Sequence, residues 1–238
     1  MHHLLNLLIW LPILGGVFVL LTGDDKNPSI ARYLTLFTVI LSLLLCIPLV
    51  SGFNLDTFSM QYIEEIPWMP SLGINYSLGI DGLSLLLILL SIFTNLIVVL
   101  ATWDSIKTKI AQYMASFLIM QGLLVGVFSA MDAIVFYVFF EATLVPMYLI
   151  IGIWGSDNRV YAALKFFLYT FLGSVLLISY LSSSSEIPQF YGSQKFVENG
   201  TLTPTVSRWI GTGLIATYIL SGLAFVAFVW SSVSRLFK

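Results

Sequence analysis

Long apolar runs separated by short polar connections occupy most of the chain. A membrane-spanning helix needs roughly 20 predominantly apolar residues. Seven runs meet this length: residues 4–22, 30–50, 80–102, 111–131, 133–154, 159–181 and 209–233. The first run is too long for a signal peptide and lacks a basic leader and a small-residue cleavage site, so it is interpreted as a retained span. The pattern predicts an all-α integral membrane protein with about seven transmembrane helices.

Composition supports a membrane protein and excludes several other classes. The 238 residues are 58% hydrophobic and 9% charged, and the mean hydropathy is +0.97. A net charge of −2 without any basic block gives no basis for nucleic-acid binding. The single cysteine, Cys46, excludes an internal disulfide or a multi-cysteine metal site and is interpreted as a core residue. His2 and His3 are adjacent at the N-terminus, where a frayed end is expected, and no function is assigned to them.

Basic residues between the runs predict the topology. Alternate connections and the tail place seven of them on one side of the membrane: Lys26, Arg32, Lys107, Lys109, Arg159, Arg235 and Lys238. The opposite side gains only Lys195 and Arg208. The positive-inside rule then puts the N-terminus outside and the C-terminus in the cytoplasm, or in the matrix of an organelle. Three tryptophans expected at the inner interface agree with this: Trp103, Trp154 and Trp230.

The segment 51–77 is expected to lie folded on the outer surface. It combines acidic residues with scattered apolar ones, and Pro67 and Pro70 forbid one continuous helix.

Glu141 is the leading candidate for a functional residue. It lies within the otherwise apolar run 133–154, about 12 Å from the outer end and about 20 Å from the inner end by helix rise. A carboxyl group at such depth costs at least ~2.5 kcal/mol on insertion scales, so such residues often move protons or ions. A buried carboxyl group beside a movable cation can alternately hold and release a proton. The alternative is a neutral glutamic acid that only ties helices together.

Pro146 follows Glu141 by five residues. Its ring nitrogen cannot donate to the carbonyl of Ala142. The freed carbonyl could hydrate a proton path, or accept a hydrogen bond from Thr143 or from a neighbouring helix.

Two further charged residues carry a functional and a structural interpretation. Lys165 lies about 9 Å inside the predicted sixth span, where it could extend to the headgroups or take part in a proton relay. Asp81 stands at the start of the third span, where capping of the helix is favoured over transport.

Three segments resemble one family. They are YSLGIDGLSLLLILL from Tyr76, FFEATLVPMYLIIGIWG from Phe139 and RVYAALKFFLYTFLGS from Arg159. They look like the first half of the antiporter-like subunit M, or chain 4, of proton-translocating NADH:quinone oxidoreductase (complex I), and the resemblance covers residues 1 to about 181.

The resemblance implies an antiporter-like fold and a place in the membrane arm of complex I, most simply in a bacterial inner membrane and less simply in an organellar one. It implies that Glu141 is a proton-channel residue and that Lys165 has a lesser relay role. NADH, FMN, iron–sulfur clusters and quinone are expected on other subunits, so no cofactor and no redox chemistry is expected on this chain. The expected partners are other membrane-arm subunits and the lipid bilayer, with no nucleic acid.

The family pattern is not found beyond residue 181. The expected domains are an antiporter-like part with six spans (1–181), a polar linker (182–208), and an additional span with a short basic tail (209–238). The family lysine that partners the helix-five glutamate is absent from the tail. A fused or misread tail is slightly favoured over a split gene or a shortened protein that keeps only an assembly surface. The predicted function is a truncated or chimeric proton-translocating subunit; the alternatives are a structural or assembly subunit and a cation/proton antiporter subunit.

Overall fold

The computed structural model describes residues 3–23, 28–69, 74–186, 197, 199–200 and 203–236, and the side chains of residues 224–236 are not described. The chain divides into two compact units, residues 1–164 and residues 165–238. Each unit is considered by itself.

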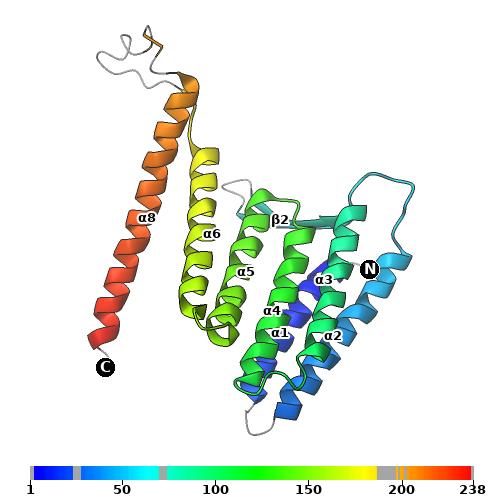
Figure 1. The fold of residues 1–238 in the computed structure, drawn as a ribbon. Coiled ribbons are helices and arrows are strands. Elements are labelled where there is room, and N and C mark those ends of the chain that lie inside the picture. Colours follow the sequence, from blue (N-terminus) through cyan, green and yellow to red (C-terminus); the bar gives the residue numbers. More distant parts are fainter. Residues whose placement is uncertain are drawn as a thin grey trace. The chain divides into compact units, whose positions relative to one another are not determined.

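Helices form nearly all of the predicted spans (Figure 1). In chain order they are α1 (Leu4–Thr22), α2 (Pro28–Ser51), α3 (Gly82–Ala101), α4 (Ile110–Ser129), α5 (Ala133–Trp154), α6 (Arg159–Ser182) and α8 (Pro204–Leu236). The six helices α1 to α6 are each long and apolar enough to cross a membrane. Helix α8 contains the seventh predicted run and begins five residues before it. The predicted helical membrane fold is therefore confirmed.

Helix α4 lies at the centre of the first unit, in contact with α1, α2, α3 and α5 (Figure 1). Glycines let α1 approach it closely. A Cβ at Gly122 would meet the backbone carbonyl of Ile9, and one at Gly16 would lie 3.0 Å from the backbone carbonyl of Ala115. Small residues are a general means of bringing membrane helices together, because dispersion contacts between backbones replace the hydrophobic effect there.

A β-hairpin stands where only an irregular surface segment was expected. Strand β1 (Gln61–Met69) pairs antiparallel with β2 (Ile74–Ile80), and the register shifts between Pro67 and Met69. The Met131 amide donates to the Ser77 carbonyl at 2.9 Å, which ties the hairpin to the connection between α4 and α5. The fold is thus not purely helical. Pro67 was expected only to prevent a continuous helix, and an edge strand tolerates a proline at an irregularity.

Glu64 of β1 fixes the beginning of α1. Its Oε1 accepts from the Leu5 amide at 3.0 Å, and its Oε2 accepts from the Asn6 side-chain amide. The Tyr76 hydroxyl donates to Asn6 Oδ1 at 2.8 Å, and His3 Nδ1 lies 3.6 Å from the Glu64 carboxylate. The His3 side chain stays largely exposed, and no function is assigned to it. His2 lies outside the described residues.

Replacing Glu64 by alanine is expected to destabilise the first unit. The change leaves the Leu5 amide and the Asn6 side chain without their acceptor, at a cost of about 1–3 kcal/mol. Unfolding followed by circular dichroism in mixed micelles would measure it. Glu65→Ala is the control, since Glu65 is exposed and its carboxylate only accepts a long 3.4 Å bond from Ser77. Equal stability of the two variants would contradict the capping role.

At the opposite end of the first unit from the hairpin, α2 and α5 both contact the connection after α3. The Arg32 guanidinium donates to the Ile106 carbonyl at 3.3 Å and lies 5.9 Å from the centre of the Trp103 ring. The Trp154 indole donates to the Thr108 carbonyl at 3.1 Å. The start of α2, the connection after α3 and the end of α5 thus lie close together, whereas Lys26 lies outside the described residues. The Trp230 side chain lies outside the described residues.

In the second unit, the end of α6 is joined to the beginning of α8. The Ser183 hydroxyl donates to the Arg208 carbonyl at 2.8 Å, and the Arg208 guanidinium lies 4.3 Å from the centre of the Tyr180 ring. Tyr180 also packs against Trp209, with ring centres 5.0 Å apart.

Candidate functional site

Glu141 lies near the middle of α5. The helix begins at Ala133, where Asp132 Oδ1 accepts from the amides of Ile134 at 2.7 Å and Val135 at 3.2 Å. Eight residues of helix place Glu141 about 12 Å from this end. The cap fixes the start of the helix and therefore the depth of the carboxyl group.

The Glu141 side chain is on the face of α5 that points away from α4. Four of the five buried residues of α5 share one face at helical spacing, Val135, Phe139, Thr143 and Pro146, and the fifth, Leu144, lies off that face. Phe139 packs directly on α4, because a Cβ at Gly126 would lie 2.6 Å from its ring. Glu141 follows Phe139 by two residues, which is about 200° around the helix at about 100° per residue. The carboxyl group therefore faces away from the interface between α4 and α5.

Both carboxylate oxygens of Glu141 are buried, and within the described part of the chain neither has a hydrogen-bond partner. Tyr137, one turn earlier on the same face, is close enough for the Glu141 carboxylate to influence it electrostatically. A buried carboxylate is stable only when it is paired or when it holds a proton. The structure thus shows a buried carboxyl group for which the described residues supply no hydrogen-bond partner.

Pro146 is buried one and a half turns beyond Glu141. The Thr143 hydroxyl donates to the Phe140 carbonyl at 2.6 Å. It does not bond to Ala142, so the predicted compensation by Thr143 is not found. Thr143 instead satisfies its own hydroxyl within the preceding turn, as is usual for threonine in helices.

A cavity of about 260 Å³ extends along α5 from the end that carries the basic connections. Its lining runs from Lys109 and Trp154 to Ser116, Val145 and Pro146. Val145 follows Glu141 by four residues, so the two side chains are neighbours on the helix surface. The cavity therefore lies on the side of α5 that faces α1 and α4, and it ends at a residue one helical turn from Glu141.

Lys165 lies in α6 and is exposed. It is the first residue of the second unit, whereas Glu141 belongs to the first. A relay between the two residues stays a prediction.

Asp81 caps α3, as predicted. Its Oδ1 accepts from the Ser84 amide at 2.7 Å. This hydrogen bond is the main reason that the pKa of Asp81 is lower than its ordinary value. Among the described residues, no group of three or more histidine, cysteine, aspartate or glutamate side chains could hold a metal ion.

Asp81→Ala is expected to cost about 1 kcal/mol, the usual cost of a lost helix cap. Because the pKa of Asp81 is lower in the folded state, its stabilising effect is present above the unfolded pKa and is lost as the pH falls through the folded pKa. Wild type and variant should therefore differ in unfolding midpoint at neutral pH and converge in acid. Asp81→Ser, which keeps an acceptor, is the control and should retain most of the stability. A difference that persists unchanged in acid would contradict the cap.

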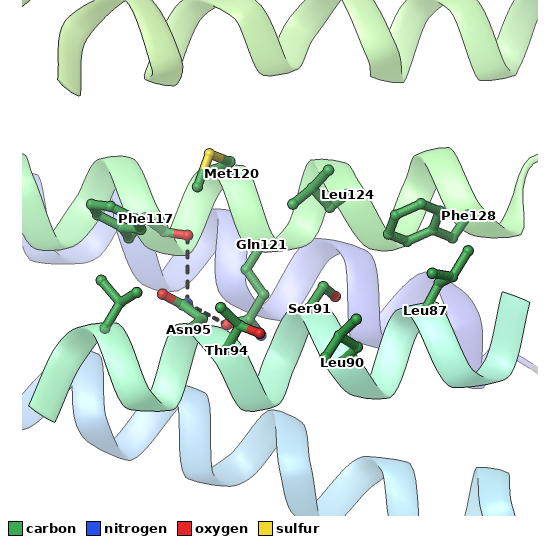
Figure 2. Close-up of a pocket in the computed structure, with 11 residues that line it drawn as sticks. Leu87, Leu90, Ser91, Thr94, Asn95, Phe117, Met120, Gln121, Leu124 and Phe128 are labelled. Atoms are coloured by element: carbon green, nitrogen blue, oxygen red, sulfur yellow. Dashed lines mark hydrogen bonds between the residues drawn. The ribbon is translucent and has the colours of Figure 1, made fainter. Parts of the chain in front are cut away.

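Two buried residues escaped the sequence analysis, Asn95 of α3 and Gln121 of α4. Both are polar amides inside predicted spans, and this position in the sequence could have identified them. The Asn95 amide donates to Gln121 Oε1 at 2.5 Å (Figure 2).

The fold defines a class, the multi-pass helical membrane proteins, with six helices long and apolar enough to cross a membrane among the described residues. A family model described as NADH:quinone oxidoreductase/Mrp antiporter, transmembrane, matches residues 130–231. This match extends beyond residue 181, where the resemblance was expected to end.

Within that class, the chain is similar to one kind of subunit. It is 39% identical over 181 residues to NADH-quinone oxidoreductase subunit M of Rhodobacter capsulatus, covering 75% of this chain and 35% of that protein. It is also 39% identical over 172 residues to NADH-ubiquinone oxidoreductase chain 4 of Marchantia polymorpha, covering 72% and 34%. The predicted resemblance to subunit M or chain 4 is confirmed. The chain spans about a third of the length of these relatives.

Solved structures agree with this similarity. A chain of respiratory complex I from Thermus thermophilus with bound NADH matches with a TM-score of 0.62 and 31% identity, covering 74% of this chain and 35% of that one. A chain of the Mrp complex from Dietzia matches with a TM-score of 0.61 over 84% of this chain and 20% of that one. Its identity is 16%, so this second likeness shows the fold alone.

Proposed function

We propose that the chain contributes to proton translocation as a membrane-arm subunit of a complex I type NADH:quinone oxidoreductase. The observation that carries the proposal is Glu141, a carboxyl group with both oxygens buried and unpartnered among the described residues. Glu141 would take up and release protons, and electron transfer on other subunits would drive the change. The chain itself would bind no NADH, FMN, iron–sulfur cluster or quinone.

The position of Glu141 on α5 indicates where its cationic partner would come from. The carboxyl group faces away from α4 and therefore away from the bundle of α1 to α4. The relatives are about three times as long as the matched part of this chain. We infer that the partner is a basic residue on a segment outside this sequence, with Lys165 as a possible secondary relay. The chain alone would then hold a proton without pumping it.

Water would reach Glu141 from the basic end of the first unit. The cavity that begins at Lys109 and Trp154 ends beside Val145 and Pro146, one turn from the carboxyl group. A buried water occupies roughly 30 Å³, so about 260 Å³ admits a short chain of waters. By the positive-inside rule this entrance is cytoplasmic, with the N-terminus outside and the protein in a bacterial inner membrane.

Co-purification tests the assignment to complex I. The host lacks its own subunit M gene and expresses two polypeptides: this chain with an affinity tag, and the part of the host's subunit M that this chain does not cover. The tagged chain should co-purify with NADH-oxidising activity. A tagged Glu141→Gln chain is the control for assembly and should retain the activity equally. Recovery of the intact chain without NADH oxidation would contradict the assignment and favour an antiporter subunit outside complex I.

A further inference from the structure

The groove at the basic end of the first unit changes from polar to apolar along its length. It is the cavity of about 260 Å³ that α4 and α5 line and that reaches α1 at Leu20. On α4 its lining begins at Lys109 and continues through Gln112 and Ser116 to Ile119. A cation, an amide, a hydroxyl and an apolar side chain thus follow one another from the mouth inward. A phospholipid has the same order of chemistry, from its charged headgroup through its ester groups to its acyl chains.

The length of the groove matches one leaflet of a bilayer. From Lys109 to Ile119 the chain rises about 15 Å along α4, and from Trp154 back to Val145 it rises about 14 Å along α5. The hydrocarbon core is about 30 Å thick, so both walls end near its middle. Large apolar side chains stay exposed along the deeper part, Val145 at 58% and Leu149 at 41%. An acyl chain that enters at the basic end and stops at the midplane fits this length, whereas a transmembrane helix would continue past it.

Hydrogen bonds hold the mouth of the groove in place. The Trp154 indole donates to the Thr108 carbonyl at 3.1 Å, which fixes the residue before Lys109 to the end of α5. The Arg159 guanidinium donates to the carbonyl of Ile153, a lining residue, at 2.9 Å. Lys109 and Arg159 are both exposed. Two cations are therefore positioned at the mouth by contacts with its own backbone.

The charge at the mouth favours an anion. The positive end of the α4 helix dipole points to the same place, because the helix begins at Ile110. Two described carboxylates lie at this end of the unit, Asp104 and Asp157, and neither lines the groove. A lysine ammonium binds a phosphate group as a point charge, and tryptophan is typical of the headgroup level. The mouth therefore complements a lipid phosphate.

We propose that this groove binds one anionic phospholipid from the leaflet on the basic side. The phosphate lies between Lys109 and Arg159, and one acyl chain lies along Ile119 and Leu149. A zwitterionic lipid offers the same chain without the net negative charge, and soluble phosphate offers the charge without the chain. The binding does not depend on the proton role of Glu141. The acyl chain and the waters of the proposed proton path would occupy the same space, so a bound lipid would close that entrance.

Native mass spectrometry tests the proposal, because it resolves each bound lipid by its mass. The full chain in detergent micelles is titrated with dioleoyl phosphatidylglycerol and, in parallel, with dioleoyl phosphatidylcholine, which has the same acyl chains. The first phosphatidylglycerol should bind about 5- to 25-fold more tightly, since each lysine or arginine near an anionic lipid contributes about 1 kcal/mol, or about fivefold. Excess inorganic phosphate should not displace it. Equal binding of the two lipids, or displacement by inorganic phosphate, would overturn the proposal.

Two pairs of variants locate the lipid. Lys109→Gln should reduce the preference for phosphatidylglycerol about fivefold, whereas Lys107→Gln, exposed in the same connection but outside the lining, should leave it unchanged. Leu149→Trp fills the groove from an exposed position and should weaken binding of the first lipid of either kind. Ile134→Trp, exposed on the same helix but outside the lining, is its control and should bind as wild type does.

Either of two results would place the lipid elsewhere and contradict the proposal. One is an unchanged preference in Lys109→Gln, and the other is a first lipid that binds Leu149→Trp as tightly as wild type. Leu149 is exposed, so its variant keeps the test decisive even if Lys109→Gln fails to fold.

Discussion

Gly122→Ala is expected to destabilise the first unit by about 2–3 kcal/mol, or to prevent its folding. The added Cβ would meet the Ile9 backbone carbonyl of α1 and would lie 2.6 Å from the Ile13 side chain. A side chain can change rotamer, but a backbone carbonyl inside a helix cannot move alone. Helices α1 and α4 must therefore separate along the contact that holds the bundle together.

Gly173→Ala is the matched control. Gly173 lies in α6, and no atom lies within 4 Å of a Cβ added there. Alanine in an open helical position is favoured over glycine by roughly 0.5–1 kcal/mol. Reversible unfolding in mixed micelles should show opposite signs for the two substitutions. A neutral or stabilising Gly122→Ala would show that the close approach of α1 and α4 is not required.

The spans could be predicted from the sequence because the membrane fixes both their length and their composition. In α5 the predicted run and the observed helix coincide, since Asp132 caps one end and Gly155 follows the other. The partners of each helix could not be predicted. The central position of α4 depends on which helices pack closely against its small residues. Apolar residues on all sides of a helix do not indicate which side faces a neighbouring helix.

The hairpin and its attachment to α1 were missed for a related reason. The hydrogen bonds of Glu64 to Leu5 and Asn6 join positions more than fifty residues apart, and no local pattern encodes them. The Asp81 cap, in contrast, is a contact over three residues and was predicted correctly. Hydrogen bonds between residues close in the sequence could be predicted, and polar contacts between distant residues could not.

At the candidate site, the depth of Glu141 could be predicted from the sequence, but the direction of its side chain could not. An isolated acidic residue in an apolar run is conspicuous at any position. The orientation of its side chain follows from the contact between Phe139 of α5 and Gly126 of α4, which identifies the face of α5 that packs on α4. That orientation turns the carboxyl group away from α4.

Glu141→Gln is expected to abolish or sharply reduce proton translocation in a complex that contains this chain. Glutamine keeps the size and the hydrogen-bonding capacity of the side chain but cannot release a proton. Loss of a positioned proton-transfer group slows transfer by about 100-fold or more. A carboxyl group that only ties helices together would tolerate the change, because the amide can still accept and donate hydrogen bonds.

The most direct measurement is the proton yield per NADH oxidised in vesicles that contain the assembled complex, with wild type, Glu141→Gln and Glu65→Gln compared at equal complex content. Glu65 is an exposed glutamate of the hairpin, so its variant controls for the loss of one carboxylate. The proposed mechanism predicts a proton yield close to wild type for Glu65→Gln and a sharply lower yield for Glu141→Gln, with the complex intact in both. An unchanged yield for Glu141→Gln would contradict the proton role of this residue.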